Sequence, residues 1–140
     1  MFTIEEFIDF IIDLVEELYA DRLEDYSAAE YLRHGGCLDL ASILLHYYPN
    51  GYLMIKRDED HYAIFLEGKV YDVNKEQNIS DFRFARKDDI DNFYLSPKMD
   101  LSYRDGKSFV PYMIENIDIC MMRIRQTDLT NPYQDGKIRA

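Results

Sequence analysis

The chain has 140 residues, and 47% of them are hydrophobic, which is enough for one globular domain with a buried core. Its 27 Asp and Glu outnumber its 16 Lys and Arg, giving a net charge of −11. This charge argues against direct nucleic-acid binding through phosphates and favours a basic charged partner. Because the apolar runs are far shorter than the roughly 20 residues that span a bilayer, and because the cationic start of a signal peptide is missing, we expect a cytoplasmic protein without a membrane partner.

Helices are predicted first, from apolar spacing and from their caps. Residues 4–18 carry apolar side chains at helical spacing with acidic residues between them. A capping-box spacing, in which Ser or Thr is followed three residues later by Glu, occurs twice and places two helix starts: Thr3 with Glu6, and Ser27 with Glu30. The second helix is short and ends at Gly35-Gly36, and a third helix is predicted over residues 37–48.

A small sheet is predicted next, because three β-like runs follow the turn signal Pro49-Asn50-Gly51. They cover residues 52–57, 61–66 and 69–73, and the tight Glu67-Gly68 between the last two predicts a hairpin. Residues 74–108 carry a weaker pattern, with a short helix expected over 87–94 and turns at Ser96-Pro97 and Asp105-Gly106.

One domain accounts for these elements. Pro111 suits the first turn of a last helix whose apolar stripe extends to Ile124. We expect an α+β domain over residues 1–126, in which the Cys37 helix packs on a small antiparallel sheet flanked by N- and C-terminal helices. Residues 127–140 are expected to form a flexible C-terminal tail.

The expected hairpin brings a histidine and a carboxylate together. If Glu67 and Gly68 are the two central turn residues, Leu66 pairs with Lys69, and alternation puts His61 and Asp72 on one face. They are then diagonal neighbours, about 7–8 Å apart at the backbone, which is close enough for their side chains to meet.

Cys37 supplies a candidate nucleophile, because a thiol that opens a helix gains from the positive end of the helix dipole. The predicted triad has Cys37 as nucleophile, His61 as general base and acid, and Asp72 as the residue that orients the imidazole. Asn74, on the same face, is an alternative orienter or a substrate contact. Cys120 lies within a helical apolar stripe and is interpreted as part of the core.

Two stretches of the chain resemble the core of the papain-like superfamily, including its transglutaminase-like and NlpC/P60-like groups. The first is Gly35-Gly36-Cys37-Leu38-Asp39-Leu40-Ala41, and the second is 61–74, from His61-Tyr62-Ala63 to Asp72-Val73-Asn74. The resemblance covers roughly residues 30–78. It implies a thiol-dependent hydrolase, deamidase or acyltransferase acting on an amide, ester or isopeptide carbonyl of a protein or peptide-like substrate, without a cofactor. Papain-type enzymes often carry an oxyanion-hole Gln about six residues before the cysteine, where this chain has Tyr31, so the Cys37 amide is the one donor assigned.

Two other interpretations remain open at this point. Zinc would find acceptable ligands in His34, Cys37, His61 and Asp72, but no CxxC motif is present, and we expect no metal. A non-catalytic acidic protein is the alternative function: its charge and 12 tyrosines suit an inhibitor or nucleic-acid mimic that occupies a basic partner.

Overall fold

The computed structural model describes residues 2–95 and 106–130, and the description below is confined to them. Five α-helices and a short 3-10 helix occur in these ranges. Both predicted capping boxes are present, at Thr3 with Glu6 and at Ser27 with Glu30. The bounds are α1 Ile4–Leu23, α2 Ala28–His34, α3 Cys37–Tyr47, η1 Ile79–Asp81, α4 Lys87–Leu95 and α5 Phe109–Thr130.

The strands form one antiparallel sheet of five strands in the order β4-β3-β2-β1-β5. Leu66 pairs with Lys69 and Phe65 with Val70, so the predicted hairpin register is confirmed. The bounds are β1 Tyr52–Lys56, β2 Tyr62–Leu66, β3 Lys69–Asp72, β4 Lys75–Gln77 and β5 Phe82–Phe84.

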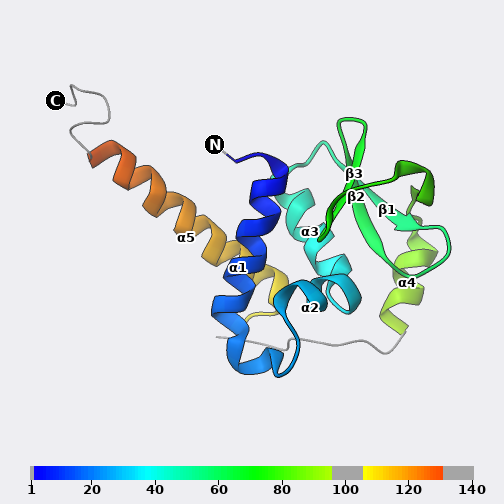
Figure 1. The fold of residues 1–140 in the computed structure, drawn as a ribbon, viewed down its shortest axis with the longest axis horizontal. Helices are drawn as coiled ribbons and strands as arrows, with labels where there is room; N and C mark the ends of the chain where they lie inside the picture. The colour runs from blue at the N-terminus through cyan, green and yellow to red at the C-terminus, as the bar shows by residue number, and fades with distance from the viewer. Residues whose placement is uncertain (1, 96–105, 131–140) are drawn as a thin grey trace.

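The helices cover one face of the sheet (Figure 1), and the main core lies between the helices and this face. Ile55, Tyr62, Ile64 and Tyr71 belong to this core together with buried residues of α1, α3 and α5. The predicted α+β architecture, with the Cys37 helix on a small antiparallel sheet, is therefore confirmed.

The opposite face of the sheet, called here the outer face, carries a second and smaller cluster. Met54, Ala63, Val70 and Phe82 are buried in it, with Phe65 packed against them. Among the described residues, no helical side chain belongs to this cluster. The outer face is thus the side of the sheet that the described helices leave uncovered.

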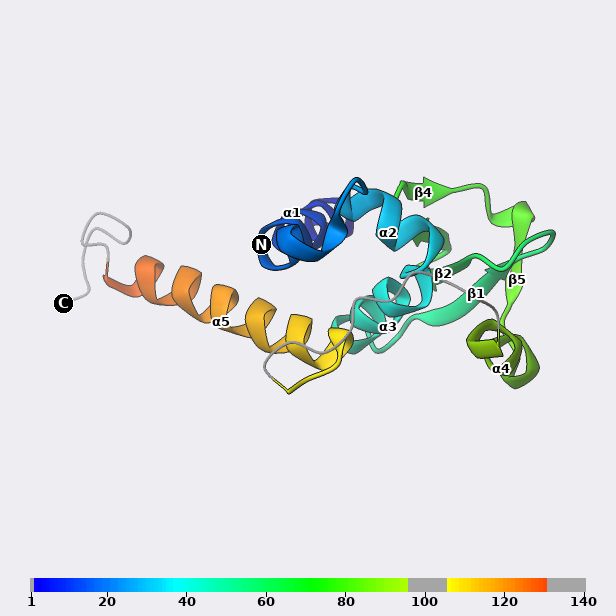
Figure 2. The same cartoon turned by 90° about the horizontal axis from the view of Figure 1, so that it is seen from below.

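The C-terminal part of α5 extends beyond the rest of the molecule in both views (Figure 1 and Figure 2). The helix continues to Thr130, into the region for which a tail is predicted from residue 127, and residues 131–140 lie outside the described ranges, as does the predicted turn at Ser96-Pro97. Within the described residues, no helix combines the length and the apolar character needed to cross a bilayer.

Candidate active site

Cys37 is positioned by the turn that joins α2 to α3. The carbonyl oxygen of Tyr31 accepts hydrogen bonds from the amides of Gly35, at 3.0 Å, and Gly36, at 2.7 Å, so α2 ends there. Helix α3 starts at the next residue, with Gly36 as N-cap and no side chain capping it. The backbone amide of Cys37 therefore lies at a helix N-terminus that no side chain caps.

Only glycine fits at position 36 in this turn, because the Tyr31 side chain fills the space that a Cβ atom would need. A Cβ atom added there would lie 2.3 Å from Cε2 of the Tyr31 ring, and real Cβ atoms do not approach so closely. Tyr31 is fully buried, and its hydroxyl donates a hydrogen bond of 3.0 Å to Asp39 Oδ2 in the first turn of α3. Tyr31, at the position of the papain-type Gln, thus fixes the segment that precedes Cys37.

The β2–β3 hairpin positions the other two candidate residues. Glu67 and Gly68 both have positive φ, 50° and 84°, as the two-residue turns that match strand twist require. His61 immediately precedes β2 and Asp72 ends β3, so both lie at the end of the sheet where α3 begins. His61 Nε2 lies 2.6 Å from Asp72 Oδ2, as the hairpin register predicts.

The His61 ring is held on both of its nitrogens. Nε2 faces Asp72, and Nδ1 lies 3.2 Å from the carbonyl oxygen of Arg33 at the end of α2. Because a carbonyl can only accept, Nδ1 must carry a proton to make this bond, and a carboxylate at 2.6 Å favours a proton on Nε2 as well. The geometry therefore favours the doubly protonated imidazolium.

The pKa of His61 agrees with this protonation. Burial by itself would lower the pKa, but hydrogen bonds with Asp72 and Cys37 and the charges of both groups outweigh burial and raise the pKa to about 9. His61 is consequently a cation at neutral pH. Cys37 and Asp72 therefore both interact with the same imidazole.

Asp72 is a buried carboxylate, 5% exposed, and both of its oxygens are used. Oδ2 faces His61 and Oδ1 accepts a hydrogen bond of 2.8 Å from the Asn74 backbone amide. A buried carboxylate is costly unless it is paired and hydrogen-bonded, and these contacts meet that need. Asn74 thus supports Asp72 through its main chain, while Asp72 is the residue that contacts the imidazole.

A polar cavity of about 120 Å³ adjoins His61 and Asp72. Its walls combine cationic, anionic and amide side chains from α2, the sheet and the β1–β2 turn. They are Arg33, His34, Lys56, Glu59, Asp60, His61, Asp72, Asn74 and Gln77. We call this space the polar pocket.

The two cysteines differ in burial. Cys37 is 2% exposed and does not line the polar pocket, so its thiol is covered by protein. Cys120, on α5, is half-buried against the main core, and both thiols are free. Within the described residues no three His, Cys, Asp or Glu side chains are arranged to hold a metal ion.

The sequence predicts the elements that carry the three candidate side chains, but it does not predict the contacts that hold these side chains in place. The Arg33 carbonyl carries no sequence signal, because every residue has the same group. For the Tyr31–Asp39 contact the sequence offers one signal, a tyrosine six residues before the cysteine. That Asp39 is the partner of this tyrosine becomes evident only when α2 and α3 are placed together.

Comparison with known families gives one match. A family model described as Phage YunG-like protein matches residues 11–119, which is more than half of the chain and includes Cys37, His61 and Asp72. Comparison with curated proteins and with solved structures finds no match.

Proposed function

We propose that this chain, which belongs to the phage YunG-like family, is a cysteine-dependent enzyme that attacks an amide, ester or isopeptide carbonyl. Cys37 is the nucleophile, His61 the general acid and base, and Asp72 the group that orients and charges the imidazole. One observation carries the proposal: a single imidazole is hydrogen-bonded to a buried carboxylate and interacts with a thiol that opens a helix. The resemblance to the papain-like superfamily is in keeping with it.

The first half of the reaction forms an acyl-enzyme. The Cys37 sulfur, paired with the His61 imidazolium, adds to the carbonyl carbon, and the oxygen takes up the electron pair as an oxyanion. The Cys37 amide, at the uncapped start of α3, is placed to donate to that oxyanion. Because Nε2 lies 2.6 Å from Asp72 whereas the contact of Nδ1 with the Arg33 carbonyl is longer, at 3.2 Å, Nδ1 is the nitrogen that gives its proton to the leaving amine or alcohol as the bond to carbon breaks.

The second half releases the acyl group. His61, now neutral at Nδ1, takes a proton from water or from an amine or alcohol acceptor, which adds to the thioester carbonyl. The thiolate then leaves, and the ion pair with His61 is restored. Water as acceptor gives hydrolysis or deamidation, and an amine gives acyl transfer, so the acceptor that enters the site decides the outcome.

The proposal is tested with p-nitrophenyl acetate, an activated ester that needs little binding. Cys37 should become acetylated as one equivalent of p-nitrophenolate is released in a burst, because acylation precedes hydrolysis. Intact-protein mass spectrometry and peptide mapping locate the acetyl group, and absorbance follows the burst.

Matched variants distinguish acetylation that depends on the proposed triad from acetylation of any exposed thiol. Cys37→Ala should abolish the burst, whereas Cys120→Ala should keep it, since Cys120 has no such imidazole partner in the proposal. Asp72→Asn preserves the shape of the side chain but removes its charge, and should slow acetylation by roughly 10² to 10⁴. A burst that survives Cys37→Ala, or acetylation of Cys120 alone, would contradict the proposal.

A further inference from the structure

A second pocket lies where the start of α1, the end of α3 and the middle of α5 come together. It has a volume of about 340 Å³, which is in the range of pockets that bind small molecules. Four aromatic side chains, one carboxylate and one thioether line it among the described residues. They are Phe2, Phe7, Tyr47, Tyr48, Asp118 and Met121. We call this space the aromatic pocket.

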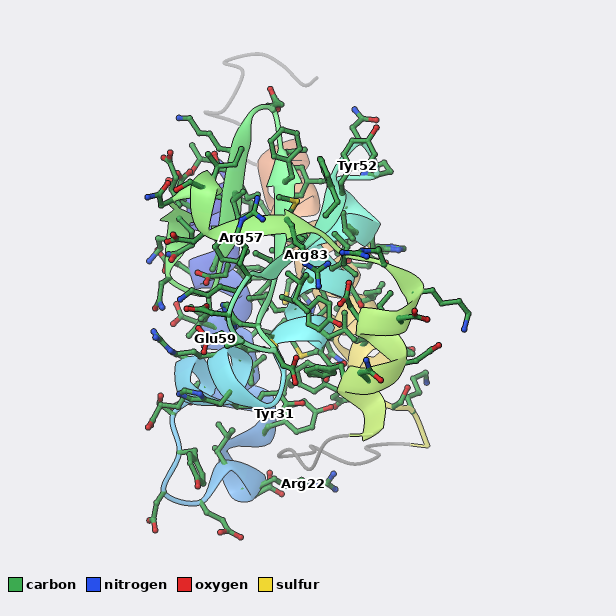
Figure 3. All side chains as sticks on the ribbon, turned by 90° about the vertical axis from the view of Figure 1, so that its right-hand side faces the viewer. Arg22, Tyr31, Tyr52, Arg57, Glu59 and Arg83 are labelled. Atoms are coloured by element: carbon green, nitrogen blue, oxygen red, sulfur yellow. The ribbon has the colours of Figure 1, made fainter. Side chains whose placement is uncertain are left out.

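The aromatic pocket is separate from the candidate active site. Tyr47 ends α3 and Cys37 begins it, so the two sites lie at opposite ends of this helix, roughly 15 Å apart at 1.5 Å per residue. Figure 3 shows a matching separation along the sheet, where Tyr52, which follows α3 in the chain, and Glu59, which lines the polar pocket, lie at opposite ends. A ligand of the aromatic pocket is therefore not the substrate that Cys37 attacks.

The rings of the aromatic pocket stand as walls around it and do not form a single stack. The Tyr47 ring makes an angle of 76° with the Phe7 ring at a centroid distance of 5.2 Å, and the Tyr48 ring makes an angle of 70° with it at 6.1 Å. The Phe2 ring is 6.2 Å from Phe7. Rings at steep angles can present their faces to one guest from several directions, and a cation is attracted to the face of an aromatic ring.

The charges at the aromatic pocket are negative. Asp118 lines it, and Oδ1 of this carboxylate accepts a hydrogen bond of 2.7 Å from the Tyr47 hydroxyl. Burial and the charge of Glu5 raise the pKa of Tyr48, so a second carboxylate acts on the same wall. No cationic side chain lines the pocket within the part of the chain that the structure describes. The carboxyl end of α3, which carries partial negative charge, also lies here.

We infer that the aromatic pocket binds an organic cation that carries a trimethylammonium group. The methyl groups of such a cation pack on aromatic rings, while its positive charge is attracted by the ring faces, by Asp118 and by the end of α3. A primary ammonium group suits the pocket less, because it is strongly hydrated and carries three donors, whereas the walls are mainly rings. This binding does not involve Cys37 and is independent of the proposed function.

The test titrates the full chain with choline and with 3,3-dimethyl-1-butanol, in which a carbon atom replaces the charged nitrogen of choline. Choline should bind at least about tenfold more tightly, because the attraction of the rings and of the carboxylate acts on charge alone. Two-dimensional NMR measures both affinities, and amide shifts at residues 47–48 and 118–121 should locate the ligand. Equal affinities, no binding of choline, or shifts confined to the polar pocket would overturn the inference.

Two variants remove one attraction each. Asp118→Asn removes the charge but keeps an oxygen that can accept from Tyr47, and Tyr48→Leu removes a ring but keeps an apolar side chain. Each should weaken choline binding roughly three- to tenfold and leave the neutral compound within about twofold. Glu115→Gln removes another carboxylate of α5, one that does not line the pocket, and should leave choline binding unchanged. A preference for choline that survives both Asp118→Asn and Tyr48→Leu contradicts the inference.

A second pair of compounds distinguishes the two sources of a trimethylammonium group. They are acetyl-trimethyllysine methylamide and its neutral analogue, in which a tert-butyl group replaces trimethylammonium. If the pocket takes a modified side chain, this cation binds more tightly than choline, and if it takes a small molecule, choline binds more tightly. In both cases the inference requires that the cation bind more tightly than its own neutral analogue.

Discussion

The charge of His61 is the property on which the candidate site depends. Its ring is surrounded by acceptors, Asp72 at Nε2 and the Arg33 carbonyl at Nδ1, and Cys37 adds a third interaction. Each of them stabilises the imidazolium over the neutral ring. The same cation neutralises the buried Asp72 and accompanies the thiolate that the proposal requires.

This charge links folding to pH. Because the pKa of His61 is raised from 6.5 to about 9 in the folded chain, the stabilisation is fully present below about pH 6.5 and is lost as pH rises through 9. The expected loss is up to about 3 kcal/mol, since one pKa unit corresponds to about 1.4 kcal/mol. Urea unfolding at pH 6 and pH 9.5, compared between the native chain and His61→Gln, measures it. The gap between the two proteins should be larger at pH 6, and a gap that does not change with pH would show that His61 carries no shifted charge.

The places of the three candidate residues in the fold were predictable because each place depends on local sequence. Cys37 follows two glycines at a helix start, and the Glu67-Gly68 turn sets the register that pairs His61 with Asp72. Their support was not predictable. Arg33 contributes a main-chain carbonyl, and the Asp39–Tyr31 bond joins the end of one helix to the start of the next.

At the scale of elements, the α2–α3 turn sets the position of the thiol. The Tyr31 carbonyl ends α2 by accepting hydrogen bonds from Gly35 and Gly36, and the Tyr31 ring occupies the space beside Gly36. The residue before Cys37 must therefore be glycine, which has no Cβ atom. The turn therefore joins two helices of 7 and 11 residues through contacts of a single residue, Tyr31.

Gly36→Ala tests this role. The added methyl group would meet the Tyr31 ring, and we expect a loss of about 1–3 kcal/mol in the free energy of unfolding, as for other overpacked sites. The substitution should also slow alkylation of Cys37, because α3 must shift. In a Tyr31→Ala background the same substitution should cost much less, and equal costs in both backgrounds would rule out the contact as the cause. Urea denaturation of the four proteins completes the cycle.

The longer elements could be predicted from the sequence, whereas the short edge strands could not. Capping boxes and apolar periodicity defined α1 and α2, and the tight turn defined the β2–β3 hairpin. The edge strands β4 and β5 have three residues each, too few to show alternation, and β4 is Lys-Glu-Gln. Their conformation comes from pairing with β3 and β1, which local propensity does not encode.

At the scale of the whole molecule, one group of exposed carboxylates lies on α1, an element that carries none of the three candidate site residues. The exposed carboxylates of α1 include Glu6, Asp9, Asp13 and Glu17, while the polar pocket mixes charges of both signs. An acidic protein that occupies a basic partner would depend on surface carboxylates and on salt and would tolerate Cys37→Ala. The proposed enzyme would lose its function with Cys37→Ala and would tolerate substitution of surface carboxylates. Comparing substitutions on α1 with Cys37→Ala therefore distinguishes the two functions.

The burial of Cys37 gives the central claim its sharpest consequence. Exposure alone ranks the half-buried Cys120 as the more reactive thiol, since Cys37 is only 2% exposed. The proposed mechanism ranks them in the reverse order, because the imidazolium partner and the helix N-terminus lie at Cys37.

The measurement that tests this most directly is the rate of iodoacetamide alkylation of each cysteine in the folded chain between pH 5 and pH 9, by peptide mapping. We predict that Cys37 reacts faster than Cys120 near pH 7, and that His61→Gln slows Cys37 at least about tenfold while leaving Cys120 unchanged. Cys120 reacting first, or a Cys37 rate that does not depend on His61, would contradict the account.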